Sequence, residues 1–311
     1  MHTETRSFRF YKADVFTDVP FGGNPVAIIP DGHQFSDREF QQIAREMNLS
    51  ETVFVLPPTD ATTAVAKLRI FTPTQEIPFA GHPILGTFYV LATLQWFSLR
   101  EPVTHVSYEC NIGNFSVDIF VQNGKIDRLV MSQPAPQFLG TVEDMRELYE
   151  IGNALGLTKD AIATSLFPIE VVSTGLPMVI VPVRSLTAVK SISVNPTAVT
   201  EICERLGANG IMAFSTMTVE DLSDVHTRVF ACPIGITEDP ATGSASGALG
   251  GYLVKNGVVE VGPTTEIVAE QGYEIDRPSH IIIQVLSDDD MIQEIKVGGE
   301  VVMVAEGTMV Y

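Results

Sequence analysis

The side chains best suited to chemistry lie in two stretches of the sequence that share one pattern. Residues 68–88 and 227–249 each contain an apolar strand with an arginine, a loop with proline, and an apolar segment typical of a helix. His82 and Asp239 lie close to the expected starts of these two helices. Because a histidine carries protons near neutral pH and a carboxylate can orient or polarise it, this pair suits acid/base catalysis. The repeat therefore predicts two homologous halves, each with an ionisable group near a helix end.

The two expected helix starts also suit the binding of a carboxylate. Amides in the first turn of a helix have no partner within the helix, and the helix dipole favours negative charge there. Gly81 and Gly243 allow a close approach to the backbone at these points. Ordinary capping is the alternative for each motif alone, with Asp239 as an N-cap and His82 as a buried, hydrogen-bonded side chain. The pairing of the two motifs favours a binding site.

Glu51 is a third candidate for acid/base chemistry. It follows Ser50 between an expected amphipathic helix over 36–47 and an expected apolar strand over 52–56. A carboxylate that is partly desolvated at such an edge has a raised pKa and can carry a proton. Taken alone, an acidic residue before a strand more often belongs to a solvated turn.

Composition indicates two domains and excludes several classes of function. The chain has 311 residues, of which 45% are hydrophobic and 18% charged, with a mean hydropathy of +0.20. Its net charge is −19, which argues against nucleic acid or an anionic membrane as a partner. Cys110, Cys203 and Cys232 show no metal-type spacing and suit a reducing compartment. With no signal-peptide pattern or apolar run of about 20 residues, a cytoplasmic protein is expected.

Short strands are expected to dominate, with two apolar helices at the centre of the two halves. Helices 82–97 and 242–255 are apolar around most of their circumference, so each is expected to be wrapped by a sheet. The segment 132–136 is expected to be a linker. The predicted domains are therefore 1–131 and 132–305, with a final strand over 306–311 able to complete the first. The other expected strands cover 8–16, 25–29, 64–71, 103–110, 114–121, 125–131, 170–173, 177–183, 210–215 and 225–230, and the other expected helices 142–155 and 196–206.

Four motifs, in this order, resemble the PhzF family of phenazine-biosynthesis-like isomerases, and the resemblance spans residues 8–311. The motifs are Phe-Gly-Gly-Asn-Pro at 21–25, Asn-Leu-Ser-Glu-Thr at 48–52, Phe-Ala-Gly-His-Pro at 79–83 and Glu-Asp-Pro-Ala-Thr-Gly-Ser-Ala at 238–245. The resemblance implies an α+β fold of the diaminopimelate-epimerase type. Such a fold has two pseudo-symmetric domains, each a curled, mostly antiparallel sheet around a central helix, with the active site in the cleft between them.

The resemblance also implies roles for individual residues. Glu51 corresponds to the catalytic acid/base of the family, and His82 and Asp239 line the site. The positions matching substrate contacts are Ser50, Gly81, Gly243 and Ser244. The implied reaction relocates a proton on a small carboxylate-bearing substrate, such as a dihydro-hydroxyanthranilate, without metal or organic cofactor, and the implied assembly is a homodimer. Related epimerases use two cysteines at the places of His82 and Asp239, so two-thiol epimerisation is disfavoured here.

Three departures from the family pattern leave the substrate open. Asp276 stands where glycine is common, Ile84 where threonine is common, and Cys232 where proline is common.

A lyase or hydrolase that uses the same site, or an epimerase-like enzyme, is the alternative to an isomerase. A catalytically silent binding protein is disfavoured, because all three catalytic candidates are present. Walker, GxGxxG, HExxH and GxSxG motifs are absent, as is a metal-binding cluster.

Overall fold

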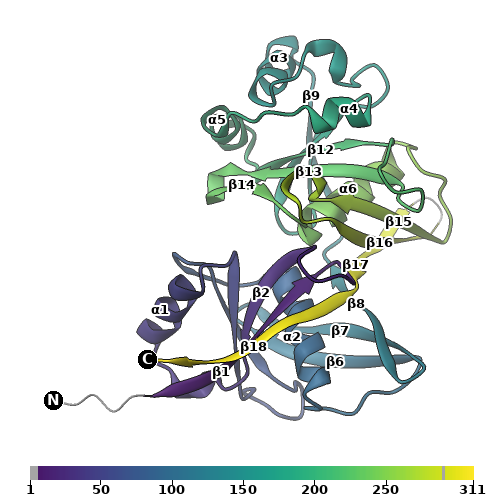
Figure 1. The fold of residues 1–311 in the computed structure, drawn as a ribbon. Coiled ribbons are helices and arrows are strands. Elements are labelled where there is room, and N and C mark those ends of the chain that lie inside the picture. The colour runs from purple at the N-terminus through teal and green to yellow at the C-terminus, as the bar shows by residue number, and fades with distance from the viewer. Residues whose placement is uncertain (1–5, 289–290) are drawn as a thin grey trace. The chain divides into compact units, whose positions relative to one another are not determined.

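The computed structural model describes residues 6–288 and 291–311, and the chain divides into two compact units (Figure 1). The first comprises Met1–Met131 and Gly298–Tyr311, and the second comprises Ser132–Val297. The chain passes from one unit to the other within strand β8 (Lys125–Gln133) and returns within strand β17 (Met291–Gly299). We describe each unit by itself.

The first unit is a mostly antiparallel sheet with two parallel pairs. Its other strands are β1 (Ser7–Val15), β2 (Asn24–Ile29), β3 (Glu51–Leu56), β4 (Lys67–Phe71), β5 (Glu76–Ile77), β6 (Val103–Cys110), β7 (Gly113–Gln122) and β18 (Val301–Val310). β2 runs parallel to β3, and β4 runs parallel to β6. Each parallel pair is joined by a helix-containing crossover, as parallel strands require. The remaining pairs, β18–β1–β2, β3–β4–β5 and β6–β7–β8, are antiparallel.

Helix α2 (His82–Thr93) lies at the centre of this unit and packs against β1, β2, β3 and β18. It is buried on nearly every side, which explains its apolar sequence. Gly86 permits the close packing, since a side chain there would lie 2.5 Å from Val26 Cγ1. The helix ends earlier than the predicted residue 97, because Gln95 adopts a left-handed conformation with φ of 60°.

Helix α1 (Asp37–Met47) covers the outside of the first sheet. Ser36 caps it, and the reciprocal hydrogen bond to Glu39 completes the capping box that the sequence favours. Its apolar face joins a cluster of aromatic side chains, in which Phe40 packs against Phe54 with ring centroids 4.6 Å apart. A short 3₁₀ helix, η1 (Gly32–Gln34), precedes it.

The second unit repeats the strand pairings of the first. Its other strands are β9 (Gln137–Val142), β10 (Ile169–Ser173), β11 (Pro177–Pro182), β12 (Gly210–Ser215), β13 (Val225–Ala231), β14 (Ile236–Asp239), β15 (Thr264–Gln271) and β16 (Ser279–Asp288). β11 runs parallel to β12 and β13 parallel to β15, as β2–β3 and β4–β6 do in the first unit. The β10–β11, β12–β13, β13–β14 and β15–β16 pairs are antiparallel. The two predicted homologous halves are thus visible as one order of pairing used twice.

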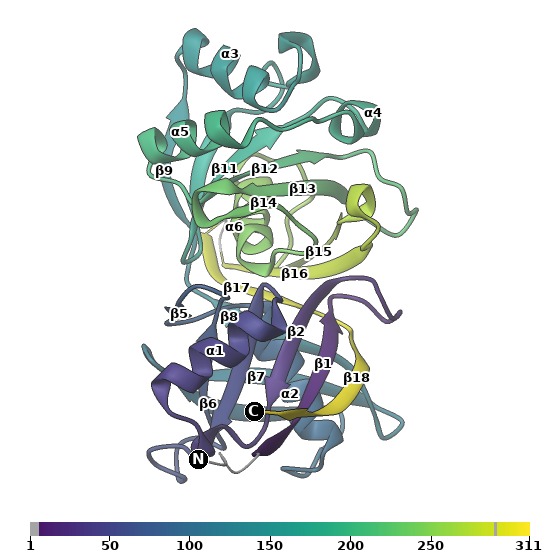
Figure 2. The same ribbon diagram turned by 60° about the vertical axis from the view of Figure 1, so that its left-hand side comes forward.

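Helix α6 (Gly243–Lys255) is the counterpart of α2, and Figure 2 shows it among the strands of the second unit. A side chain at Gly250 would lie 2.5 Å from Ile283 Cγ2, so a glycine is needed where the helix meets β16. The outer face carries α3 (Met145–Ala154), α4 (Leu186–Lys190) and α5 (Pro196–Leu206), with the short helices η2 (Lys159–Ala161), η3 (Cys232–Ile234) and η4 (Tyr273–Ile275) between strands. An aliphatic cluster around Ile151, Val179 and Ile202 fills the space beneath them.

The structure corrects two predicted boundaries. Ser132 and Gln133, expected in a linker, continue strand β8. The second unit ends at Val297 rather than at the predicted residue 305, because β18 pairs with β1 along its whole length, from Val301 opposite Val15 onward. In Figure 1 the yellow β18 runs beside the purple β1.

Asp276 occupies a backbone position that favours glycine. It ends η4 with φ of 56° and is exposed, and aspartate tolerates this left-handed region better than most residues do. This departure from the family pattern therefore preserves the backbone. Ile84, another departure, is fully buried in α2, and Cys232 begins η3.

We expect Asp276→Gly to raise the free energy of unfolding by about 0.5 kcal/mol, because relief of the left-handed strain exceeds the entropy that glycine adds to the unfolded chain. Urea denaturation of both proteins measures this difference. Asp127→Gly, within strand β8, is the matched control and should lower stability. A less stable Asp276→Gly protein would contradict the interpretation.

Candidate active site

Glu51 and His82 meet inside the first unit. Glu51 is the first residue of β3 and His82 the first residue of α2. His82 Nε2 lies 3.3 Å from Glu51 Oε2, and the two side chains are only 9% and 14% exposed. The strand order places them together, since β3 and the β4–β5 hairpin that leads into α2 are neighbours.

Burial sets the protonation behaviour of Glu51. It raises the pKa of this carboxyl group above its ordinary value, and the neighbouring Ser50 hydroxyl offsets only part of the increase. Oε2 of Glu51 is fully buried, and no residue within 6–288 or 291–311 donates a hydrogen bond to it. A buried acceptor without a donor is rare in folded proteins and costs stability. Glu51 thus has the environment of a carboxyl group able to carry a proton, with His82 Nε2 3.3 Å away.

Ser50 connects Glu51 to the start of β2. Its hydroxyl lies 3.3 Å from Asn24 Oδ1 and 3.4 Å from the carbonyl oxygen of Pro25. This contact follows from the parallel pairing of β2 and β3, in which Val26 lies opposite Glu51. Asn24 was not among the predicted site residues, although its motif, Phe-Gly-Gly-Asn-Pro, was one of the four that carried the resemblance.

Asp239, Gly243 and Ser244 lie together in the second unit. Asp239 is the last residue of β14 and is buried, and the Thr242 hydroxyl donates to its Oδ2. The carbonyl of Gly243 accepts from Gln133 Nε2 at 3.0 Å, and the carbonyl of Ser244 lies 3.2 Å from Thr174 Oγ1. The N-cap of α6 is Thr242, so the alternative reading of Asp239 as the cap is wrong.

The two central helices differ from the outer α-helices at their N-termini. Helices α1, α3, α4 and α5 each have a cap side chain that accepts a hydrogen bond from a first-turn amide; these caps are Ser36, Asp144, Ser185 and Asn195. The cap of α2 is Gly81, which has no side chain, and the Thr242 hydroxyl at α6 is directed to Asp239 instead. Both central helices therefore keep their first-turn amides clear of a cap side chain, as binding of an anionic group there requires.

The arginine in each repeated motif has a structural role. Arg69 in β4 forms a bidentate pair with Glu76 in β5, at 2.8 and 2.6 Å, and Arg228 in β13 forms one with Glu238 in β14, at 2.8 Å for both bonds. Each pair ties a strand to the short strand that leads toward a central helix. The sequence pattern identified both arginines but did not indicate that each pairs with a glutamate.

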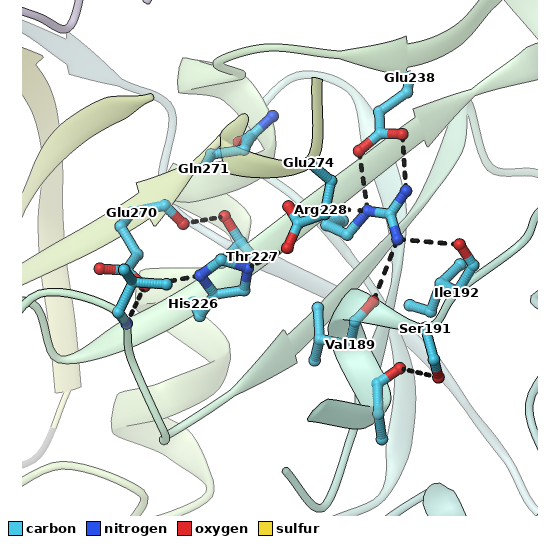
Figure 3. A network of polar contacts seen from close by, with 12 residues as sticks. Val189, Ser191, Ile192, His226, Thr227, Arg228, Glu238, Glu270, Gln271 and Glu274 are labelled. Carbon is cyan, nitrogen blue, oxygen red and sulfur yellow. Dashed lines mark hydrogen bonds and ion pairs between the residues drawn. The ribbon is translucent and has the colours of Figure 1, made fainter. Parts of the chain in front are cut away.

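A buried polar network continues from Arg228 (Figure 3). His226 is fully buried between two carboxylates, with Nδ1 2.6 Å from Glu270 and Nε2 2.9 Å from Glu274. Burial disfavours a charge on this histidine, but the hydrogen bonds and charges of the two glutamates outweigh burial and raise the pKa of His226. Glu270 also accepts from the backbone amides of Val219 and Glu220. The network fixes the end of β15.

Comparison with known proteins places this geometry in a family. The family model described as phenazine biosynthesis-like protein, PhzC-PhzF, matches residues 13–307. The chain belongs to the PhzF family. Trans-2,3-dihydro-3-hydroxyanthranilate isomerase of Pseudomonas chlororaphis is 34% identical over 96% of this chain and 97% of its own length. A crystal structure of a PhzF-family phenazine biosynthesis protein from Bacillus anthracis has a TM-score of 0.87 and 29% identity, covering 98% of this chain and 99% of that one.

A more distant structure extends the likeness of the fold. A hydroxyproline epimerase from Agrobacterium vitis matches with a TM-score of 0.64 at 12% identity, over 98% of this PhzF-family chain and 91% of that chain. The predicted α+β, epimerase-like fold and the prediction of an isomerase are confirmed. Within the residues that the structure describes, no helix is long and apolar enough to span a membrane.

Proposed function

We propose that this PhzF-family isomerase relocates a proton on a small carboxylate-bearing substrate, with Glu51 as the acid/base group. The observation that carries the proposal is the buried Oε2 of Glu51, which receives no hydrogen bond from a described residue and belongs to a carboxyl group with a raised pKa. A general base needs a pKa near the working pH and a place for the substrate within hydrogen-bond reach. Burial raises the pKa of Glu51 in the direction that a general base needs, and its Oε2 accepts no hydrogen bond from a described residue.

His82 and Asp239 complete the proposed catalytic set. His82, 3.3 Å from Glu51, is placed to exchange a proton with it or to hold it in orientation. Asp239 presents a buried carboxylate at the approach to α6. The proposed substrate-binding positions are Ser50, Gly81, Gly243 and Ser244, where the helix starts without side-chain caps would receive a carboxylate or a developing enolate.

Trans-2,3-dihydro-3-hydroxyanthranilate is the first substrate to test, because the relative from Pseudomonas chlororaphis is named for its isomerisation. In the proposed reaction one C–H bond breaks, the ring double bonds shift, and a C–H bond forms at another carbon. No atom is gained or lost overall. The proton that leaves the first carbon passes to Glu51, and the protonated Glu51 then donates a proton to the second carbon.

Mass spectrometry of the product tests this proposal. In H₂O the product should have the mass of the substrate, and in D₂O deuterium should enter at carbon through exchange of the Glu51 proton with solvent. A product lighter by one water would identify an elimination, and a product heavier by one water would identify a hydration. Either result, or the absence of any carbon-bound exchange with this substrate and a panel of cyclic carboxylates, would refute a proton-relocating isomerase.

Three further expectations stay predictions, the first two implied by the family resemblance and the third by composition. They are an active site in a cleft between the domains, a homodimeric assembly, and a cytoplasmic location. Catalysis without metal or organic cofactor is likewise part of the proposal.

A further inference from the structure

Gln271, at the end of β15, holds the loop that carries Asp239. Its side chain is fully buried. Its Nε2 donates to the carbonyl oxygen of Asp239 at 2.7 Å and to Thr242 Oγ1 at 3.0 Å, while its Oε1 accepts from the Thr242 amide at 3.2 Å. One amide side chain therefore contacts both ends of the segment 239–242.

The chemistry of these partners fixes the direction of every hydrogen bond. A backbone amide only donates and a backbone carbonyl only accepts, so the orientation of the Gln271 amide is determined. Thr242 Oγ1 consequently accepts from Gln271, and its single proton is free to point to its other partner, Asp239 Oδ2. The chain of bonds runs from Gln271 through Thr242 and ends on Asp239 as the acceptor.

This use of Thr242 departs from the ordinary role of an N-cap threonine. Its hydroxyl would normally accept from an amide in the first turn of α6, a contact that stabilises a helix. Here the N-cap side chain makes no such bond. A helix start that lacks the usual side-chain cap departs from a local rule of helix formation. Such departures are expected at functional sites.

The residues after Gln271 fit around the same loop. Gly272 has φ of 83°, and a side chain there would lie 2.5 Å from the carbonyl oxygen of Pro240. The fully buried Ser279 places its hydroxyl 3.1 Å from the Gln271 carbonyl and 3.4 Å from the Pro240 carbonyl. On the opposite side of β15, Glu270 is held by His226. Gln271 is therefore fixed by its neighbours before any ligand binds.

We propose that Gln271 is a positioning residue for Asp239, which it orients through the Thr242 hydroxyl. The proposal rests on the proposed function of Asp239 in the isomerase site. It assigns a role to the segment 270–279, which the family resemblance marked only by its departure at Asp276. Gln271 is 32 residues from Asp239 in the chain, so no local motif indicates this link.

The test follows the carboxylate carbon of Asp239 by ¹³C NMR, with its signal identified by its loss in Asp239→Asn. This readout requires no substrate, so it separates failure of this inference from failure of the proposed function. Thr242→Val should move the signal and Thr242→Ser should restore it. Gln271→Met, which removes no group bonded directly to that carboxylate, should also move it. Thr200→Val, which alters a hydroxyl bonded within α5, is the matched control and should leave it in place.

Turnover of trans-2,3-dihydro-3-hydroxyanthranilate provides the second readout. Because a hydrogen bond to a charged group contributes about 1.5–3 kcal/mol, Thr242→Val should lower kcat by roughly ten- to a hundredfold, with recovery in Thr242→Ser. Urea denaturation shows whether each variant is folded, and Thr242→Val keeps the test decisive if Gln271→Met does not fold. An Asp239 signal unmoved in folded Gln271→Met, or unmoved in Thr242→Val, would overturn the inference.

Discussion

Glu51→Gln is expected to lower kcat by at least about a hundredfold, because glutamine neither accepts nor releases a proton at the buried Oε position. Binding should change little, since glutamine has nearly the shape of glutamate. The measurement is the initial rate with trans-2,3-dihydro-3-hydroxyanthranilate, together with calorimetric binding of 3-hydroxyanthranilate, an aromatic analogue without a proton to relocate. Full activity in the variant would refute the assignment of Glu51.

The same substitution should leave the protein as stable as before or make it more stable. The pKa of Glu51 is raised in the folded state by burial, so the unfolded chain, with a carboxyl pKa of about 4.3, releases this proton first. The native protein therefore loses stability as the pH rises from about 4.3 through the raised pKa. Glutamine does not titrate. The stability advantage of Glu51→Gln should thus be small at pH 4 and larger at pH 7.

Glu109→Gln is the matched control within the same unit. Lys67 and Thr59 donate hydrogen bonds to Glu109 and lower its pKa to about 2. The pH dependence of stability that Glu109 causes has the opposite sign to that of Glu51. The stabilisation by ionised Glu109 is present above the pKa of the unfolded state and is lost as the pH falls through the pKa of the folded state. Glu109→Gln should therefore reduce stability at pH 7 and leave kcat unchanged. Urea denaturation at both pH values distinguishes the two carboxylates.

Arg228→Met is expected to cause the largest loss of stability, about 3–5 kcal/mol, because it breaks a buried ion pair on one side only. Glu238, with 13% of its side chain exposed, would lose both bonds of its bidentate pair. The carbonyl oxygens of Val189 and Ile192, which accept from Arg228 Nη1 at 3.1 and 2.9 Å, would lose that donor. The free energy of unfolding from urea denaturation, with circular dichroism as the probe, measures the loss.

Arg69→Met provides the matched comparison in the first unit. Arg69 is more exposed than Arg228, at 19% against 8%, and its second partner, Asp37, is 85% exposed. Arg69→Met should therefore lower the free energy of unfolding by less than Arg228→Met does. The double variant Arg228→Met with Glu238→Gln should recover part of the loss, since it removes the uncompensated carboxylate. A loss below about 1 kcal/mol in Arg228→Met would show that water or rearrangement compensates for the pair.

Local sequence patterns explain the parts of this protein that depend on neighbouring residues. The repeated strand–loop–helix motif, the capping box at Ser36 and the Asn123-Gly124 hairpin all follow from local propensities. The hairpin residues have φ of 53° and 71°, as the turn requires. Glu51 and His82 were singled out from their types and positions, and the fold brings them within 3.3 Å.

Other features depend on long-range contacts that no short motif contains. Glu76 and Glu238 could not be paired with their arginines, because an acidic residue in a loop usually faces water. Gln271 gave no signal in the sequence, since a single glutamine at a strand end has no characteristic partner. A final strand able to complete the first domain was predicted, but its pairing with β1 joins residues almost 300 positions apart, and periodicity cannot identify such a partner.

The pairing of β18 with β1 has a consequence for the order of folding during synthesis. The first unit consists of an early segment and a late one, separated by the whole of Ser132–Val297. A ribosome must therefore complete the second unit before it makes the last strand of the first. Domains usually fold in the order of synthesis, the earlier one first. Here the later unit is the first whose strands are all available, and until β18 emerges β1 has an open edge able to pair with another chain.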